Sequence, residues 1–402
     1  MRILFLSDNF PPETNAPATR TFEHCREWVK QGAEVTVITC VPNFPEGRVY
    51  EGYSNKAYQT EITEGIKVIR VWTYMTANKG FLKRTIDYIS FGISSFLAGV
   101  FIGTDLIVAT SPQFFTALSG RALSFWRKKP WVMEVRDLWP ESIKTVGAMK
   151  DNWFIRYFEW QEKRCYKRAS KIIVVTDAFK KEISNKGIPA SKISVVKNGA
   201  NLDLFQPIEK DRRLLNTLNL EGKVILGYVG THGMAHKLDF LMDCAKKLKG
   251  TDCHFLFIGS GAEKDNLRRK KREENIDNVT LLDAVSKKEI KNYISILDVA
   301  LINLKKDNLF KTVIPSKIFE NSAMGIPILL GVDGESRSIL EKYGAGLFYE
   351  PENVDDFLEK LNVITNPDHY TSYRQGGLDL AADYDRKKLA AAMLGHLEEV
   401  VK

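Results

Sequence analysis

The sequence predicts an α/β protein with two domains, each built on a doubly wound parallel sheet. Short apolar segments alternate with amphipathic segments along the 402 residues, which is typical of strands buried between two layers of helices. The same sequence of elements begins twice, near residues 3 and 224. It is a strand, then a loop rich in glycine or proline, then a helix, then a second strand. A length of 402 residues also favours two domains over one.

In the first half, residues 3–6 form the first predicted strand, and a loop rich in proline and asparagine follows at residues 9–17. The apolar spacing of residues 19–30 predicts a helix, and residues 34–39 predict the next strand. A further strand is expected at residues 131–135. Open parallel sheets bind ligands at the carboxyl ends of their strands, so we expect functional residues in the loops that follow these strands.

The second half begins with a predicted strand at residues 224–228, a loop at 230–237, a helix at 238–248 and a strand at 254–258. Further helices are expected at 263–275, 287–297, 317–324 and 354–364, and further strands at 279–282, 299–303, 326–330 and 347–350. The turn-rich segment 197–207 marks the junction. We therefore expect an N-terminal domain at 1–200, a C-terminal domain at 201–380, and a last helix within 381–402 that packs back on the first domain.

The charge of the chain is divided unevenly between its halves. The net charge is +8, but residues 1–200 hold 29 Lys and Arg against 19 Asp and Glu, and residues 201–402 hold 29 against 31. All seven tryptophans also lie in the first half. Excess positive charge predicts an anionic partner. Nucleic acid is disfavoured, because the aromatic residues follow helical core spacing instead of alternating with basic residues. An anionic membrane surface and phosphate fit better.

Residues 88–104 are uncharged, but 17 residues are fewer than the ~20 that a spanning helix needs. They predict a buried or surface-lying helix, and the basic, apolar lead-in at 79–84 suits contact with an anionic leaflet. The five scattered cysteines fit a reducing compartment, and the N-terminus lacks the pattern of a signal peptide. We therefore expect a cytoplasmic protein, peripheral on the inner face of the plasma membrane.

The loop 230–237 is the first candidate phosphate site, with Thr231, His232, Gly233 and Lys237 as its binding residues. Glycines let the backbone approach a ligand, and the free amides of a helix start attract phosphate. Lys237 can neutralise a diphosphate, and His232 can donate a hydrogen bond to it. The spacing of His232 and His236 also suits a metal, but no third ligand stands at motif spacing, so we expect no metal. A plain turn is the alternative.

The second candidate site contains Ser316, Lys317 and Glu320. Pro315 and Ser316 mark a helix start whose amides can meet an anion. Lys317 adds positive charge, and Glu320 can bind the paired hydroxyls of a ribose one turn later. The alternative is a helix-capping box, although Ser316 and Glu320 are four residues apart instead of three. By contrast, Gly259 and Gly261 lack the third glycine of a dinucleotide-binding loop and indicate a structural turn.

In the first half, Arg136 and Asp137 follow the predicted strand at residues 131–135. Asp137 can orient an acceptor hydroxyl or act as a base, and Arg136 can stabilise phosphate charge, which makes both candidate catalytic residues. The alternative is an internal ion pair that anchors the loop.

These motifs together resemble those of the retaining glycosyltransferases of the GT-B fold, family four, over nearly the whole chain. The resemblance is carried by NFPPETNAPATR at 9–20, VVKNGANLDLF at 195–205, the loop 230–237, PSKIFE at 315–320, AMGIP at 323–327 and GAGL at 344–347. VRDLWPE at 135–141 and GTHGMAH at 230–236 are similar to the subgroup of L-fucosamine transferases of O-antigen and capsule synthesis.

The resemblance implies two Rossmann-like domains that face each other across a cleft, with the donor bound in the C-terminal domain and the acceptor in the N-terminal one. It implies transfer of N-acetyl-L-fucosamine or a related amino sugar from a UDP-sugar to a polyprenyl-diphosphate-linked saccharide, in lipopolysaccharide or capsule synthesis. No cofactor or metal is implied. In the family's front-face mechanism the leaving diphosphate helps to take the acceptor proton, so the protein must stabilise the charge of the diphosphate.

Four positions depart from the family pattern. The family carries two glutamates eight residues apart; Glu320 matches the second, but Thr312 replaces the first. Arg136 stands where many members have histidine. Asn15 and Ala16 replace a pair of glycines, and the resemblance implies that they contact the donor diphosphate. A nucleotide-sugar epimerase or hydrolase of the same fold is the alternative function, and the basic, aromatic first half favours the transferase.

Overall fold

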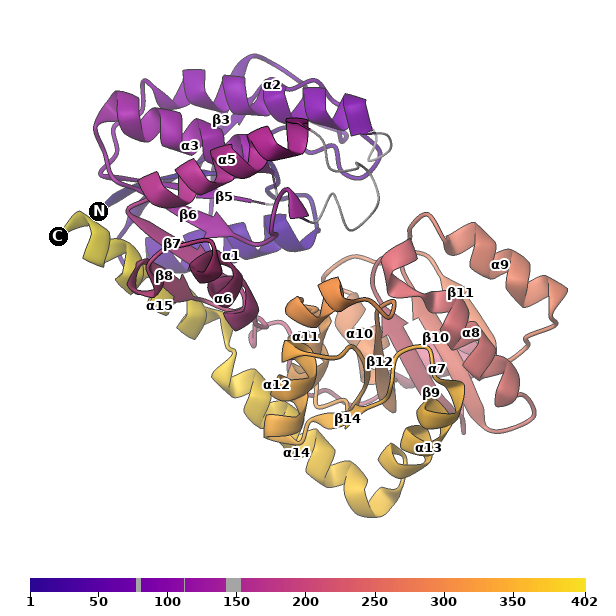
Figure 1. Cartoon of the computed structure of the whole chain (residues 1–402). Coiled ribbons are helices and arrows are strands. Elements are labelled where there is room, and N and C mark those ends of the chain that lie inside the picture. Colours follow the sequence, from indigo (N-terminus) through magenta and orange to yellow (C-terminus); the bar gives the residue numbers. More distant parts are fainter. Residues whose placement is uncertain (77–80, 112, 142–152) are drawn as a thin grey trace. The chain divides into compact units, whose positions relative to one another are not determined.

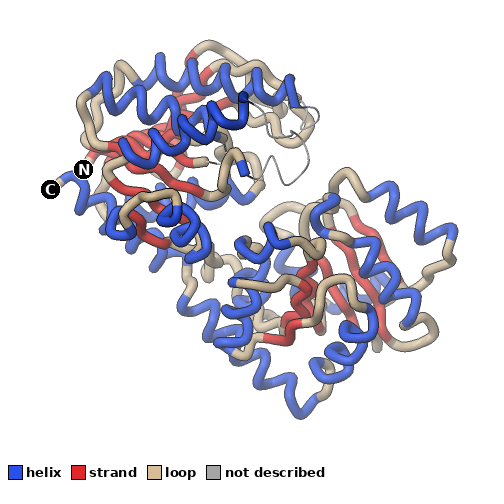
Figure 2. Tube along the Cα trace, in the orientation of Figure 1, coloured by secondary structure: helices blue, strands red, loops and turns tan. Residues whose placement is uncertain are grey.

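The computed structural model describes residues 1–76, 81–111, 113–141 and 153–402 (Figure 1). They form two compact units, one of Met1–Lys197 with Lys387–Lys402 and one of Asn198–Arg386. Each unit holds one sheet between helices, as the colouring of Figure 2 makes visible. The predicted architecture of two parallel-sheet α/β domains is confirmed.

The sheet of the first unit has eight strands in its described part, in the order β3-β4-β2-β1-β5-β6-β7-β8. Its strands are parallel except for β3, which forms an antiparallel hairpin with β4 that the sequence analysis did not include. The order reverses between β1 and β5, so the loops after these two strands flank the switch point. The strands are β1 Arg2–Leu6, β2 Glu34–Cys40, β3 Tyr58–Thr63, β4 Ile66–Val71, β5 Leu106–Thr110, β6 Trp131–Val135, β7 Lys171–Val174 and β8 Ile193–Val195.

Helices cover both faces of this sheet. Alternate residues of β1 explain why: Leu4 and Leu6 enter one core with residues of α2, α3, α5 and α6, while Ile3 and Phe5 enter another with residues of α1 and α15. Trp28 of α1 donates a hydrogen bond from Nε1 to the carbonyl of Ala390 in α15, 2.8 Å away. The last helix therefore returns to the first unit, as predicted. The helices are α1 Ala16–Lys30, α2 Phe81–Gly99, α3 Phe114–Arg127, α5 Trp153–Arg168, α6 Asp177–Asn185, α15 Arg386–Val401 and the 3-10 turn η1 Ala190–Lys192.

The sheet of the second unit has the order β11-β10-β9-β12-β13-β14, and its strands are all parallel. The order reverses between β9 and β12. The strands are β9 Val224–Val229, β10 Cys253–Ile258, β11 Val279–Leu282, β12 Val299–Asn303, β13 Ile328–Gly331 and β14 Gly346–Phe348. The helices are α7 Arg212–Leu218, α8 Leu238–Lys247, α9 Lys264–Glu273, α10 Ile290–Ser295, α11 Lys317–Ala323, α12 Glu335–Tyr343, α13 Val354–Ile364 and α14 Pro367–Asp383, with 3-10 turns η2 Met234–His236 and η3 Asn308–Thr312.

Several helix bounds differ from those expected. Helix α1 begins at Ala16, three residues early, because the side chain of Asn15 caps it by accepting a hydrogen bond from the amide of Ala18. Helices α3, α5, α6, α7, α12 and α14 were not predicted from the sequence. Helix α2 ends at Gly99, before the end of the uncharged segment. Over the part of the chain that the structure describes, no helix has the length and apolar character that crossing a membrane requires.

Candidate functional site

The loop after β9 is packed tightly against the loop after β10, at the carboxyl edge of the second sheet. A Cβ atom on Gly259 would lie 1.8 Å from the carbonyl oxygen of Gly230, and one on Gly261 would lie 2.4 Å from that of His232. The amide of His232 donates to the carbonyl of Ser260, 2.9 Å away. Gly259 and Gly261 are therefore needed for close packing, which is the structural turn that the sequence predicts.

His232 lies at the centre of this loop, with its side chain fully buried. Neither ring nitrogen has a hydrogen-bond partner among the described residues. Burial, helped by the charges of Lys264 and Lys317, lowers the pKa of His232 to about 4. Burial and Lys317 likewise lower the pKa of His236 to about 3. Both imidazoles are thus neutral at pH 7, and each can donate one hydrogen bond to an anion.

Lys317 reaches the same loop from the start of α11. Its ammonium lies 3.8 Å from the centre of the Tyr228 ring, and a Cβ on Gly230 would lie 2.9 Å from Nζ. Within the described residues this buried nitrogen has no hydrogen-bond partner, and burial lowers the pKa of Lys317 to about 7. A buried cation without a hydrogen-bond partner, beside two neutral imidazoles, makes a site for an anion. It stands at the switch point between β9 and β12, where this class of sheet binds ligands.

Lys237 is placed differently from Lys317. It precedes α8 in a left-handed conformation with φ of 47°, and its ammonium pairs with a carboxylate oxygen of Asp239 at 2.7 Å. An anion at the loop must therefore compete with Asp239 for this lysine. Thr231 is exposed, and its carbonyl accepts a hydrogen bond from the Tyr228 hydroxyl at 2.9 Å. Gly233 precedes the turn η2.

Ser316 and Glu320 flank Lys317 on α11. The Ser316 side chain makes no capping hydrogen bond, so the capping-box alternative is not realised. The Glu320 carboxylate interacts electrostatically with Lys317 and favours its charged form. Thr312, which replaces the first family glutamate, donates its hydroxyl to the carbonyl of Leu309 at 2.8 Å. The structure thus brings Lys317, Glu320, His232 and the glycine loop together.

The predicted residues of the first unit lie at the carboxyl edge of its own sheet. Arg136 and Asp137 directly follow β6, and the Arg136 amide donates to the Ser111 hydroxyl at 3.0 Å. The buried carboxylate before them, Glu134, pairs with Arg20 at 2.9 Å. Although burial raises the pKa of Glu134, the charges of Arg20 and Arg136 outweigh it and lower that pKa.

Asn15 and Ala16 form the start of α1 in the first unit. Besides capping α1, Asn15 donates from its side-chain amide to Oδ1 of Asn9 at 2.6 Å. Ala16 is exposed. The predicted contact of these two residues with a diphosphate stays a prediction.

A cavity of about 180 Å³ at the first switch point escaped the sequence analysis. Its lining includes Asp8 from the loop after β1, Gln113 from the loop after β5, Glu13 and, on α2, Asp87. The signal available in the sequence was the position of residues 7–18 and 110–114 directly after two predicted strands. A single carboxylate in a loop produces no periodic pattern that could reveal it. Asp87 is also some 80 residues from Asp8 in the sequence, so only the folded structure shows that the two lie together.

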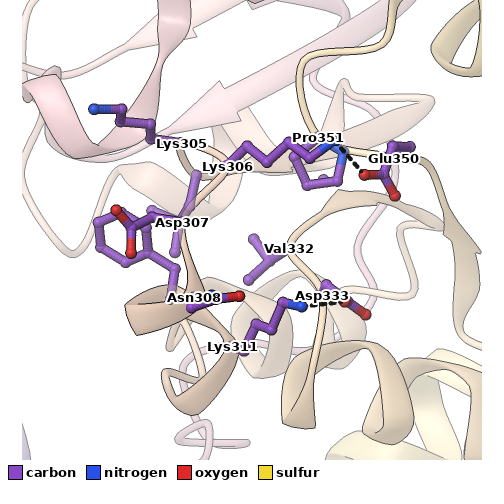
Figure 3. Close-up of a pocket in the computed structure, with 12 residues that line it drawn as sticks. Lys305, Lys306, Asp307, Asn308, Lys311, Val332, Asp333, Glu350 and Pro351 are labelled. Atoms are coloured by element: carbon purple, nitrogen blue, oxygen red, sulfur yellow. Dashed lines mark ion pairs between the residues drawn. The ribbon is translucent and has the colours of Figure 1, made fainter.

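A larger cavity of about 340 Å³ lies at the carboxyl ends of β12, β13 and β14 (Figure 3). Lys306 points toward Glu350 and pairs with it at 2.8 Å, and Lys311 pairs with Asp333 at 3.5 Å. Lys306 and Lys311 therefore have carboxylate partners, whereas the ammonium of Lys317 has no hydrogen-bond partner among the described residues. No predicted site residue lines this cavity.

Two doubly wound sheets, the second with a cationic site at its switch point, are the architecture of the GT-B fold, and the family models below show that the chain is a glycosyltransferase. Two family models identify the family. Residues 15–199 match the glycosyl transferase 4-like domain, and residues 211–377 match the glycosyl transferases group 1. The chain belongs to the family-four glycosyltransferases.

Similar proteins cover nearly the whole chain. A protein of Escherichia coli K12 named as a colanic acid biosynthesis glycosyl transferase, WcaI, is 24% identical over 389 residues, 93% of this chain and 95% of its own. A Bacillus subtilis protein named for teichuronic acid biosynthesis, TuaH, is 25% identical over 63% of each chain.

Solved structures support the fold. Sucrose-phosphate synthase from Thermosynechococcus elongatus has a TM-score of 0.80 at 16% identity, over 99% of this chain and 98% of its own. HepE of Anabaena, solved with UDP and glucose, has a TM-score of 0.73 at 14% identity, over 99% of this chain and 100% of its own. At such identities the likeness concerns the fold alone.

Proposed function

We propose that this enzyme transfers a sugar from a UDP-sugar to a polyprenyl-diphosphate-linked saccharide during synthesis of a bacterial surface polysaccharide. The observation that carries the proposal is the buried ammonium of Lys317, which lacks a hydrogen-bond partner among the described residues and lies beside Gly230. The names of WcaI and TuaH, which refer to two such polysaccharides, support the pathway class. The complex of HepE with UDP and glucose supports the choice of UDP.

In this proposal the second unit stabilises the negative charge of the departing UDP. Lys317 provides the main charge, His232 donates a hydrogen bond from its neutral ring, and Lys237 exchanges Asp239 for a phosphate oxygen. Glu320 accepts hydrogen bonds from the ribose hydroxyls. In this proposal these groups take the place of a metal ion.

The chemical step follows a retaining front-face route, in which the leaving diphosphate takes the proton of the acceptor hydroxyl. Asp137 orients that hydroxyl, and Arg136 stabilises phosphate charge. We propose N-acetyl-L-fucosamine or a related amino sugar as the donor sugar. Thr312 offers a neutral side chain where the family glutamate would place a carboxylate, so the contact with the donor sugar differs from the family pattern.

We also propose that the first unit rests on an anionic membrane, on the inner face of the plasma membrane. Helix α2 exposes four aliphatic side chains three or four residues apart, which form one stripe. Helices α3 and α5 lie beside it on the same face of the sheet and add exposed aromatic residues (Figure 1). Exposed large apolar side chains on neighbouring helices support a binding surface here. The exposed residues are Ile86, Ile89, Ile93, Leu97, Phe101, Phe125, Trp126, Trp153, Tyr157 and Trp160.

The first experiment is a thermal-shift panel with UDP-, GDP-, ADP- and dTDP-sugars. A ligand that binds only the folded state raises the melting temperature by mass action, so UDP-sugars are expected to give the largest shift. A larger shift with GDP-sugars would contradict the choice of UDP, and no shift with any of them would overturn the proposed function.

The second experiment follows the labelled sugar of the stabilising donor. Its appearance on a polyprenyl-diphosphate saccharide is expected. If the enzyme instead releases the free sugar or converts it without any acceptor, the alternative epimerase or hydrolase function is correct.

A further inference from the structure

The cavity at the first switch point gathers three carboxyl groups in a small space. Asp8 and Glu13 are buried, and Asp87 is half-buried on α2. Burial raises the pKa of Asp8 to about 6 and those of Glu13 and Asp87 to about 7. The charge of Asp8 adds to the increase at both other carboxyls. Three carboxyl groups so close together indicate that the cavity binds a ligand that donates hydrogen bonds.

The three carboxyl groups have different tasks. Glu13 is structural, because its Oε1 accepts hydrogen bonds from the amides of Asn43 and Phe44, at 2.8 and 2.9 Å. Asp8 accepts hydrogen bonds from the side-chain amides of Asn9 and Gln113. No hydrogen bond from the described part of the chain reaches the Asp87 carboxylate, so this group is available to a ligand.

Two further polar atoms of the cavity wall lack partners. The Oε1 of Gln113 and the hydroxyl of Thr73 are both buried, and neither makes a hydrogen bond within the described residues. Because a buried polar atom without a partner destabilises the fold, these two atoms also indicate a polar occupant. Phe44 also lines the cavity and offers an aromatic ring to the apolar face of a ligand.

Positive charge in the cavity wall is limited. Arg84 is the lining arginine, and its Nε donates to the Tyr88 hydroxyl at 3.1 Å. The charges of Arg136 and Arg70 act on Asp8 and Glu13, but Arg70 is already paired with Glu61 at 2.6 Å. At pH 8, above the pKa values of all three carboxyl groups, an anionic ligand would therefore meet Asp8, Glu13 and Asp87 as negative lining groups against Arg84 as the positive one.

We propose that this cavity binds the terminal sugar of the acceptor through its hydroxyl or amino groups, and that its carboxyl groups select neutral and amino sugars over acidic ones. The inference rests on the proposed function and deepens it, since it names the chemical class of the acceptor sugar. Hydroxyl and amino groups supply the donors that Asp87, Gln113 and Thr73 lack. At pH 8, the pH of the test below, Asp8 and Asp87 are ionised and would repel the carboxylate of a uronic acid. A volume of about 180 Å³ leaves room for one sugar ring.

The test measures binding of octyl glycosides to the full chain without donor at pH 8, by saturation-transfer NMR and titration. The probes are a glucoside, a glucosaminide and a glucuronide, which share one ring and differ in charge. We expect the glucoside and glucosaminide to bind at least tenfold more tightly than the glucuronide. Asp87→Asn should reduce this selectivity to less than threefold, and Thr73→Val should weaken glucoside binding about two- to tenfold.

Glu34→Gln is the matched control, because Glu34 is exposed at the amino end of β2, the opposite edge of the sheet. It should leave all three affinities unchanged. Melting temperatures establish that each variant is folded. Equal binding of glucoside and glucuronide, absence of glycoside binding, or an unchanged ratio in Asp87→Asn would overturn the inference. The UDP-induced thermal shift, measured on the same samples, tests the proposed function separately, because Lys317, His232 and Glu320, which are proposed to bind UDP, do not line this cavity.

Discussion

At the scale of single residues, Lys317 shows a conflict between stability and binding. A buried ammonium that lacks a hydrogen-bond partner destabilises the fold, and its proximity to Tyr228 offsets this only in part. A bound anion would supply the hydrogen-bond partner that the ammonium lacks, so this loss of stability is explained by a role of Lys317 in binding. Two predictions follow from the pKa of about 7 that burial gives this lysine.

The first prediction is that Lys317→Met stabilises the ligand-free protein at low pH. In the unfolded chain lysine titrates near 10.4, so between pH 7 and 10.4 the unfolded state binds more protons, and stability rises with pH. Below pH 7 the penalty for burying the charge is complete. The substitution removes that penalty, so its gain in melting temperature should be larger at pH 6 than at pH 9. An equal gain at both pH values would contradict the assignment.

The second prediction is that UDP binding at pH 8 is accompanied by proton uptake. The diphosphate favours the charged form of Lys317, which is largely neutral at pH 8 when the site is empty. Titration calorimetry in buffers of different ionisation enthalpy measures the uptake. Lys317→Met should abolish it and weaken UDP binding about tenfold to a hundredfold.

Lys237→Met is the matched control for this measurement. The hydrogen bond with Asp239 raises the pKa of Lys237, so this lysine is already protonated at pH 8 and takes up nothing. The control should therefore retain the proton uptake of the unmodified enzyme. If Lys237→Met loses the proton uptake and Lys317→Met keeps it, then Lys237 takes up the proton and the prediction for Lys317 is wrong.

Local sequence signals identified these residues only in part. Glycines beside a lysine and a histidine predicted the anion loop, and the helix start predicted Lys317 and Glu320. The pairing of Lys237 with Asp239 depends on the left-handed backbone at Lys237, which no residue pattern indicates. Lys317 and Gly230 are 87 residues apart in the sequence. Only the order of the strands in the sheet shows that they lie close together.

At the scale of elements, prediction worked best for strands buried on both faces. Strands such as β9 and β12 are continuous apolar runs and were recognised. The hairpin of β3 and β4 was missed because β3 is an edge strand of mixed polarity with exposed residues. Its available signal was Glu64-Gly65, both with positive φ, which is the pattern of a two-residue hairpin turn.

The third prediction concerns the apolar stripe of α2. Ile93→Glu combined with Leu97→Glu places two charges on exposed positions, so the fold should be retained while binding to vesicles of anionic lipid is lost. Flotation of vesicles at low salt measures the bound fraction. Ile62→Glu on β3 is the control, because Ile62 is also exposed, even more than Ile93 and Leu97, but lies at the edge of the sheet. Unchanged flotation of the double variant would show that the stripe does not bind lipid.

At the scale of the whole molecule, the C-terminal residues belong to the first unit although they follow the second in sequence. Met393, Leu394 and Leu397 of α15 lie in the core formed by β1 and α1. Both the last helix and its return to the first domain were predicted from the sequence. The tryptophans all belong to residues 1–197, so tryptophan fluorescence reports on the unfolding of this unit alone.

The fourth prediction uses this separation. Leu397→Ala removes a fully buried side chain from the core under α15, which typically costs 2–5 kcal/mol of unfolding free energy. The tryptophan transition should therefore move to lower temperature. Stabilisation of the second unit by UDP should persist, because its core does not include Leu397.

Leu361→Ala in α13, buried in the second unit, is the matched control. It should lower the melting temperature of the second unit in calorimetry and leave the tryptophan transition unchanged. If Leu397→Ala leaves the tryptophan transition unchanged, α15 does not unfold together with the first unit. If it shifts the transitions of both units equally, α15 stabilises both units and not the first alone.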